Sequence, residues 1–304
     1  RYGHLEGLVE LGRNLTGLSL APGNTVEPLI DGDETYPAMI AAIDDARHSV
    51  TLLSYIFDND RAGDAFVAAL RRAQERGVEV RVLVDHLGSR YSKPSIISRL
   101  REVGLPVRAF LPTRAPRLSR YANLRNHRKI LVADGRIGFT GGTNIREGHW
   151  RSLDPATPVQ CMHFRLTGPV VAHLQEAFTI DWAFASGEVL TGATWFPDVE
   201  TTGHDWARGV AHGPDEDFEK LSDLIIGALA LARRRVRIVT PYFLPDVPLI
   251  RALNVAAMRG VDLAILLPVR NNIFLVDWAC RAQLDQMLEK GCRVLLTPPP
   301  FDHT

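Results

Sequence analysis

Residues 47–57 (RHSVTLLSYIF) and residues 233–243 (RRRVRIVTPYF) follow one pattern: basic residues, a run rich in Val, Leu and Ile, and then aromatic residues. Each is followed by a second similar stretch, residues 76–84 (RGVEVRVLV) and residues 259–267 (RGVDLAILL). The offset is 186 residues for the first pair (236 − 50) and 183 for the second (260 − 77), a drift that short loop deletions explain. This repetition predicts two copies of one structural unit.

The order of elements is the same in both copies and predicts the fold class. Residues 38–46 and 66–73 carry apolar residues at helical spacing, and Gly77 is placed to end the second helix. A third strand over residues 129–133 is expected to turn back at Asp134-Gly135. Apolar strands that alternate with helices indicate a parallel-rich sheet covered on both faces. We therefore predict an α/β fold of two pseudo-symmetric halves, each a mixed or parallel-rich β-sheet flanked by helices.

The sharpest local feature is a polar motif at the start of the third strand. Residues 126–134 (NHRKILVAD) and residues 141–144 (GGTN) give the spacing HxKxxxxD, then six residues, then GGxN. Residues two apart on a strand share a face, so His127 and Lys129 are expected to project together. Functional sites of open α/β sheets gather at strand ends, which is where this pair falls.

These residue types suit the chemistry of a phosphate ester. A histidine such as His127 can attack phosphorus or carry a proton near neutral pH, and Lys129 is a point charge for phosphate oxygens. Gly141 and Gly142 would let the backbone approach a phosphate closely, and Asn144 could add a side-chain donor. A single histidine on a strand is more often structural, but the complete set at these offsets favours a functional site.

Charge is distributed unevenly along the chain. The 304 residues include 35 Lys and Arg against 35 Asp and Glu, and this zero net charge argues against a general nucleic-acid binder. A hydrophobic content of 46% excludes a disordered chain. Residues 103–133 contain no acid but seven basic residues, namely Arg108, Arg114, Arg117, Arg120, Arg125, Arg128 and Lys129. Such a stretch attracts an anionic substrate, although a solvated surface loop has the same composition.

The spacing of the cysteines and the length of the apolar runs narrow the possible classes of protein. Cys161, Cys280 and Cys292 form no CxxC pair, so we expect free, buried thiols in a reducing compartment. No apolar run reaches the ~18 residues that a membrane-spanning helix needs. The chain starts at Arg1 rather than Met, which is compatible with a membrane anchor upstream.

The polar motif resembles the HKD motif of the phospholipase D superfamily, and more closely that of its cardiolipin synthase-like branch. Further stretches extend the resemblance from about Asn24 onward: Asp31-Gly32 and residues 55–57, 76–78, 85–89, 123–129, 168–169, 181–182 and 240–246. The resemblance implies two phospholipase D-like halves whose motifs meet at one site. We accordingly expect an N-terminal segment (1–23), a first domain (24–200), a linker (201–219) and a second domain (220–304) truncated within its motif.

The second motif is expected at the end of the chain. Residues 302–304 (DHT) would lie over residues 126–128 (NHR), and the offset of 176 (303 − 127) is close to the repeat offsets. We interpret His303 as the first residue of a second HKD motif whose Lys and Asp would follow Thr304. The alternative is that His303 merely belongs to a chain end.

The resemblance implies a mechanism through a phosphohistidine. We assign His127 as nucleophile and His303 as general acid and base, although the reverse assignment fits equally well. Lys129 and Asn144 would stabilise charge on the phosphoryl group, and Asp134 would support local structure or Lys129. Expected substrate contacts are Gly141, Gly142, Tyr55, Tyr242 and Arg125. No metal and no cofactor is expected.

One position departs from the family pattern. Members commonly carry an acid ahead of a His-x-Arg-x-x-Gly-Pro stretch, where it can orient a catalytic imidazole, but residues 161–169 (CMHFRLTGP) place Cys161 there. A thiol is a poor substitute for a carboxylate in that role. Either another acid such as Asp154 serves, or activity is reduced.

The resemblance favours phosphatidyl transfer between phospholipids, as in a cardiolipin synthase. Alternatives are hydrolysis of a phospholipid or nucleic-acid phosphodiester, or a catalytically weakened scaffold that binds phospholipid. The expected partners are an anionic phospholipid and the membrane surface, with no specific nucleic acid. We expect peripheral attachment on the cytoplasmic side of a bacterial membrane, with residues 111–121 as a lip that touches anionic headgroups.

Overall fold

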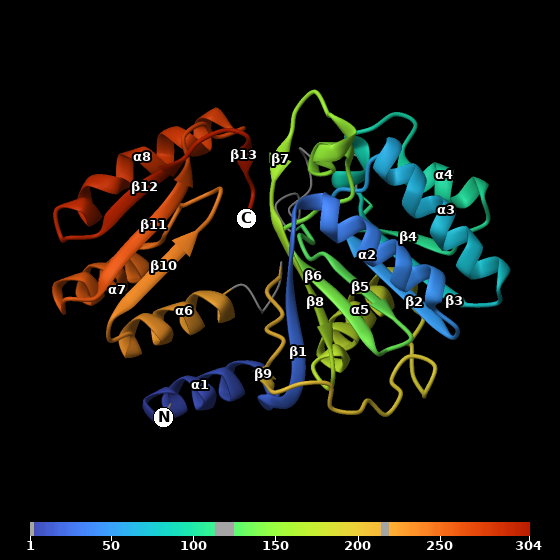
Figure 1. Ribbon diagram of the computed structural model, residues 1–304, viewed down its shortest axis with the longest axis horizontal. Helices are drawn as coiled ribbons and strands as arrows, with labels where there is room; N and C mark the ends of the chain where they lie inside the picture. The colour runs from blue at the N-terminus through green and yellow to red at the C-terminus, as the bar shows by residue number, and fades with distance from the viewer. Residues whose placement is uncertain (1–2, 113–124, 214–218) are drawn as a thin grey trace. The chain divides into compact units, whose positions relative to one another are not determined.

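A computed structural model describes residues 3–112, 125–213 and 219–304 of the chain (Figure 1). The chain divides into a larger unit, Leu20–Glu216, and a smaller unit formed by Arg1–Ser19 and Asp217–Thr304. Most of the predicted basic lip, residues 113–121, lies outside the described residues. The domain boundaries expected from the resemblance stay a prediction.

The larger unit is built on one mixed sheet with the strand order β4-β3-β2-β5-β6-β8-β1-β9. Strands β2, β3 and β4 are parallel, and all other neighbours in this sheet are antiparallel. Its strands are β1 (Ala21–Ile30), β2 (Ser49–Ser54), β3 (Glu79–Asp85), β4 (Val107–Phe110), β5 (Ile130–Ala133), β6 (Ile137–Gly141), β8 (Met162–Thr167) and β9 (Asp205–Ala207), while β7 (Val159–Gln160) lies outside it.

Helices cover both faces of this sheet, as the continuous apolar strands predicted. The helices are α2 (Asp31–Asp45), α3 (Arg61–Glu75), α4 (Ile96–Glu102) and α5 (Val171–Ser186), with short 3-10 turns at Gly88–Arg90, Glu147–His149 and Arg151–Leu153. Leu52 packs in the core beneath α2, α3 and α4, whereas its neighbour Leu53 packs in the core beneath α5. All six residues of β2 are buried because neighbouring side chains alternate between these two cores.

Local signals set the limits of α3. The side chain of Asp60 accepts a hydrogen bond from the amide of Gly63 (3.0 Å) and caps the first turn. At the other end Gly77 has a φ of 84°, and the amide of Val78 donates back to the carbonyl of Ala73 (3.1 Å). The predicted helix-ending role of Gly77 is confirmed.

The smaller unit repeats the parallel part of the larger one. Its strands β10 (Arg235–Val239), β11 (Asp262–Pro268) and β12 (Arg293–Thr297) are parallel and stand in that order. Helices α6 (Lys220–Leu231), α7 (Val247–Met258) and α8 (Phe274–Leu288) pack on these strands. Helix α1 (Glu6–Thr16) follows a 3-10 turn at Gly3–Leu5 and packs on α6. The short strand β13 is Phe301–Asp302. The matching order β2-β3-β4 and β10-β11-β12 confirms that the sequence repeat is a structural repeat.

Within the described ranges, every helix is too short or too polar to cross a membrane. The three cysteines are free and buried, as expected from their spacing.

Asp134 ties the turn between β5 and β6 to the start of β2. Its carboxylate accepts hydrogen bonds from the backbone amides of Arg47, His48 and Ser49 at 2.7–3.1 Å. Asp134 itself has a φ of 53°, a conformation that Asp and Asn tolerate better than most residues. Because Lys129 precedes the opposite end of β5, the structure favours local support over a direct interaction with Lys129.

We expect Asp134→Ala to lower the free energy of unfolding by about 2–3 kcal/mol, because three amides lose a charged acceptor. Asp134→Asn keeps an oxygen and tolerates the positive φ, so its loss should be about 1 kcal/mol. Urea denaturation followed by circular dichroism measures both. A folded Asp134→Ala protein with unchanged stability but lost activity would instead make Asp134 part of the catalytic machinery.

Candidate active site

The polar residues of the motif gather at one edge of the larger sheet. The parallel strands β2 and β3 end there, and the antiparallel pairings bring the start of β5, the end of β6 and the start of β8 to the same edge. The segments at this edge are Tyr55, Asp85, residues 125–129, residues 141–144 and His163. This is the carboxyl end of the parallel strands, where open α/β sheets commonly bind their ligands.

His127 and Lys129 lie just before β5, which begins at Ile130 rather than at the predicted Lys129. Both contact Tyr55, whose ring centroid is 4.1 Å from that of His127 and 5.8 Å from Nζ of Lys129. Nζ of Lys129 also donates to the backbone carbonyl of His127 (2.7 Å). The structure therefore brings three predicted site residues together around one aromatic ring.

The surroundings set the charge of each group. His127 is exposed at one side, but partial desolvation by its neighbours, followed by the charge of Lys129, lowers its pKa to about 4. Exclusion of water also lowers the pKa of Lys129 to about 8, and burial raises the pKa of Tyr55 to about 12. At neutral pH the site thus presents a neutral imidazole, a mostly protonated lysine and a neutral phenol. Neutral imidazole is the form that can attack phosphorus.

The residues on both sides of His127 are fixed to the protein by Asp181 of α5. Asp181 accepts from Nδ2 of Asn126 (2.7 Å) and from Nη1 of Arg128, whose distance to each carboxylate oxygen is 2.7 Å. The side chains of Arg128 and Asp181 are only 13% and 8% exposed, so water competes little for this ion pair. Oδ2 of Asp85 also accepts a hydrogen bond from the backbone amide of Asn126 (3.1 Å).

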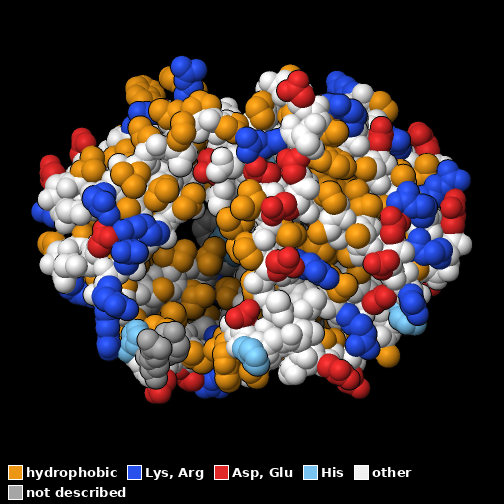
Figure 2. Space-filling view, viewed as in Figure 1, with side chains coloured by type: hydrophobic (Ala, Val, Ile, Leu, Met, Phe, Trp, Pro, Cys, Tyr) orange, Lys and Arg blue, Asp and Glu red, His pale blue; other side chains and the backbone are white. Residues whose placement is uncertain are grey.

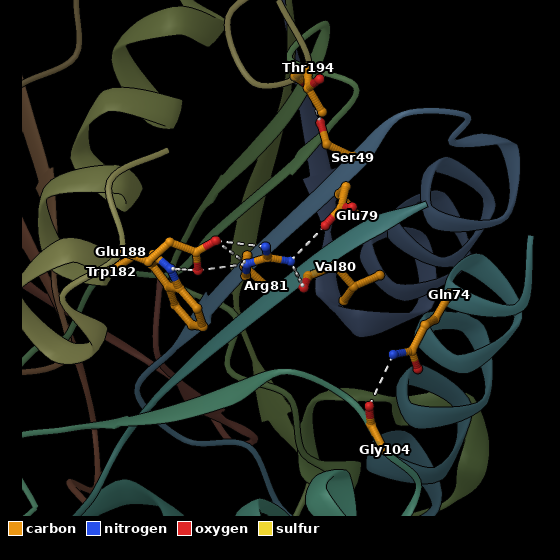
Figure 3. Close-up of polar contacts among 9 residues, drawn as sticks. All are labelled: Ser49, Gln74, Glu79, Val80, Arg81, Gly104, Trp182, Glu188 and Thr194. Carbon is orange, nitrogen blue, oxygen red and sulfur yellow. Dashed lines mark hydrogen bonds and ion pairs between the residues drawn. The ribbon is translucent and has the colours of Figure 1, made fainter. Parts of the chain in front are cut away.

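The end of α5 is in turn held against β3. Glu188 accepts from Nε1 of the buried Trp182 (2.8 Å) and from Nη2 of Arg81 on β3 (2.7 Å) (Figure 3). Because Trp182 directly follows Asp181, this contact fixes the part of α5 that carries the carboxylate. Sequence reasoning counted Asp85 and Asp181 only among the stretches that extend the resemblance. Their roles depend on contacts across 41 and 53–55 residues, for which no local spacing gives a signal.

The glycine-rich loop lies close to β8. Gly141 has a φ of 151°, and a Cβ there would lie 2.7 Å from Cα and 2.9 Å from Nδ1 of His163. The amide of Gly142 already donates to the carbonyl of Met162 (2.8 Å). Gly141 thus accommodates β8 and its histidine. Oδ1 of Asn144 accepts from the amide of Ile56 (3.1 Å), so the donor that this side chain can offer is Nδ2.

Arg125 also belongs to this edge. It is 6% exposed, and its charge contributes to the lowered pKa of His127. The same charge opposes the rise that burial causes in the pKa of Asp85.

The smaller unit contains a comparable pair of rings. His303 directly follows β13, and its ring centroid lies 5.9 Å from that of Tyr242 in an edge-to-face arrangement. The hydroxyl of Tyr242 donates to Oδ1 of Asn272 (2.9 Å), just beyond β11. Tyr55 and Tyr242 both come soon after the first parallel strand of their units. In each unit, therefore, a tyrosine at the end of that strand contacts the candidate histidine.

Comparison with known proteins decides the family. The family model described as "Cardiolipin synthase, PLD-like domain" matches residues 39–182 and 225–304. The chain belongs to this family. The result confirms the superfamily and the branch that the HKD motif resembles.

Individual relatives agree with this assignment. The chain is 36% identical over 303 residues to cardiolipin synthase A of Pseudomonas fluorescens (strain SBW25), covering 99% of the chain and 62% of that protein. It is 30% identical over 298 residues to a cardiolipin synthase of Listeria monocytogenes serotype 4a (strain HCC23), covering 94% of the chain and 60% of that protein. The chain thus spans about 60% of the length of these curated relatives.

A solved structure supports the phospholipase D-like fold. The crystal structure of phosphatidylserine synthase from Haemophilus influenzae Rd KW20 matches with a TM-score of 0.67 at 13% identity. The match covers 97% of this chain and 78% of that one. At this identity the likeness is evidence of the shared fold.

In this member of the cardiolipin synthase family, the position expected to hold an acid is part of a buried polar cluster. Sγ of Cys161 lies 3.0 Å from Nδ1 of His149 and 3.1 Å from Oγ1 of Thr143. The amide of Cys161 donates to Oδ1 of Asp31 (2.9 Å). The acid that the structure places beside Cys161 is therefore Asp31, whereas the suggested Asp154 is exposed. No group of three or more metal-ligating residues occurs in the described part of the chain.

We expect Asp181→Ala to lower kcat of the full chain by about 10²-fold, because a 1 Å displacement of a reacting group costs that much. Glu176→Gln is the matched control, since this exposed acid lies on the same helix. Removing one partner of a buried ion pair also costs about 3–5 kcal/mol of stability, so activity is measured well below the midpoint of thermal unfolding. Equal activity of both variants would show that Asp181 does not position His127.

Proposed function

We propose that this protein is a phosphatidyltransferase of the cardiolipin synthase type. The observation that carries the proposal is the neutral imidazole of His127 beside the cationic Lys129, at the carboxyl edge of the sheet in a chain of this family. The relatives are named cardiolipin synthases, which supports an anionic phospholipid as substrate.

In the proposed reaction, His127 attacks the phosphorus of one phospholipid and forms a phosphohistidine. The bond from phosphorus to the leaving alcohol breaks, and His303 gives that alcohol a proton. An incoming lipid alcohol then loses its proton to His303 and attacks the phosphohistidine, which frees His127. Lys129 and Nδ2 of Asn144 stabilise the charge on the phosphoryl oxygens. The reverse roles of the two histidines satisfy the same chemistry.

A nuclease is less well supported because the arginines on the strands of the smaller unit are paired with an acid. Arg235, Arg237 and Arg293 all form ion pairs with Asp262. On the face drawn in Figure 2, the Lys and Arg side chains of the larger unit are interspersed with Asp and Glu. A continuous basic groove would favour a nucleic acid. We also propose peripheral attachment to the cytoplasmic side of a membrane, with the basic lip (residues 111–121) against anionic headgroups.

The full chain supplied with vesicles of phosphatidylglycerol should release glycerol and form cardiolipin, which thin-layer chromatography resolves. Phosphatidic acid as the sole product would make the protein a hydrolase instead. His127→Ala should abolish turnover, with at least about 10³-fold loss of kcat. His48→Ala, an exposed histidine at the far edge of the sheet, should leave it unchanged. Full activity of His127→Ala would reject the phosphohistidine mechanism.

The lowered pKa values predict the pH dependence of kcat/KM. Activity should rise as His127 loses its proton near pH 4 and fall as Lys129 loses its proton near pH 8. Lys129→Arg keeps a positive charge at all these pH values, so its alkaline limb should move upward. An alkaline limb that stays near pH 8 in Lys129→Arg assigns that limb to a group other than Lys129.

A further inference from the structure

The strand register places His163 in one row with Lys129 across the sheet. Ile130 of β5 lies opposite Thr140 of β6, so one residue further on, Lys129 faces Gly141. Gly141 in turn pairs with His163 of β8. Residues directly opposite one another in antiparallel strands point to the same face. Lys129 and His163 therefore flank Gly141 on one face of the sheet, at the edge that carries His127.

The imidazole ring of His163 lies close to Gly141. Its Nδ1 would lie 2.9 Å from a Cβ at Gly141, so the ring lies over β6, the strand between β8 and β5. Any larger residue at position 141 would occupy the same space. The positive charge of Lys129 adds to burial in lowering the pKa of His163, which agrees with this proximity.

The hydrogen bonding of His163 defines its tautomer. Nδ1 accepts from the backbone amide of Thr143 (3.4 Å), and burial lowers the pKa of the ring to about 3. The imidazole is therefore neutral at pH 7 and carries its proton on Nε2. Nε2 is fully buried and has no hydrogen-bond partner among the described residues. A buried donor without an acceptor is unfavourable and rare in native structures, so it requires a cause.

We propose that Nε2–H of His163 donates a hydrogen bond to a non-bridging oxygen of the substrate phosphate as His127 attacks phosphorus. This inference rests on the proposed function and adds a catalytic residue to it. The donor is held in place by the bond of Nδ1 to Thr143 and by the contact with Gly141. A donor that is held in place and shielded from water can stabilise developing charge without reorganisation. His163 stays uncharged, so it complements Lys129 without repelling it.

Two amide substitutions separate the two nitrogens of the ring. His163→Asn can place an oxygen near Nδ1 for the amide of Thr143, but it has no donor at the position of Nε2. His163→Gln can place its amide nitrogen near Nε2, but it has no acceptor near Nδ1. We expect His163→Asn to lose about 10²–10³-fold in kcat with KM nearly unchanged, and His163→Gln to stay within about 10-fold of wild type.

A purely structural role for His163 predicts the opposite order, with His163→Asn the more active and the more thermostable variant. That order, or equal loss in both variants, overturns the inference. A wild-type chain without any phosphodiester turnover refutes the proposed function, whereas an active wild type with a fully active His163→Asn refutes only the role of His163.

A measurement on the unaltered full chain covers the case in which neither variant folds. Nitrogen-15 NMR of labelled histidine should show one ring protonated on Nε2 throughout pH 5–8, and inorganic phosphate should shift that signal. A ring protonated on Nδ1, or a signal unmoved by phosphate at concentrations that shift the resonances of His127, contradicts the inference.

Discussion

The carboxylate of Asp181 is the interaction on which the rest of the site depends. His127 lies within residues 125–129, which form no regular secondary structure, so strand hydrogen bonds do not hold it. Asp181 replaces them by bonding to the residues on both sides, Asn126 and Arg128. Both charges of that pair are buried, which makes the pair specific in geometry and costly to break. The Trp182–Glu188–Arg81 contact transfers this constraint to β3.

A second consequence of this arrangement concerns electrostatics. Partial desolvation and the charge of Lys129 lower the pKa of His127, so a neutral nucleophile and a largely protonated lysine coexist at neutral pH. Tyr55 contacts both groups: Nζ of Lys129 lies over its ring, 5.8 Å from the centroid, and the centroid of the imidazole lies 4.1 Å from that of Tyr55. The similar contact of Tyr242 with His303 indicates that each unit was built to present a histidine beside an aromatic ring.

The sequence predicted the parts of the fold that depend on local pattern. The repeat, the hairpin of β5 and β6 at Asp134-Gly135 and the end of α3 at Gly77 all agree with the structure. Strand β1 was not predicted, because its residues include Pro22, Gly23 and Pro28, and its place is set by pairing with β8, about 140 residues away. Among the residues of the candidate site, His127 and Lys129 could be predicted from the spacing of the HKD motif. Asp181 and His163 do not, because their roles depend on that long-range pairing and on the packing of α5.

The smaller unit depends on one carboxylate near the start of its sheet. Asp262 of β11 forms ion pairs with Arg235 and Arg237 of β10 and with Arg293 of β12, so a single acid connects all three parallel strands. These side chains are exposed to solvent, and salt screens exposed ion pairs. The three connections share one acceptor, so they weaken together as ionic strength rises.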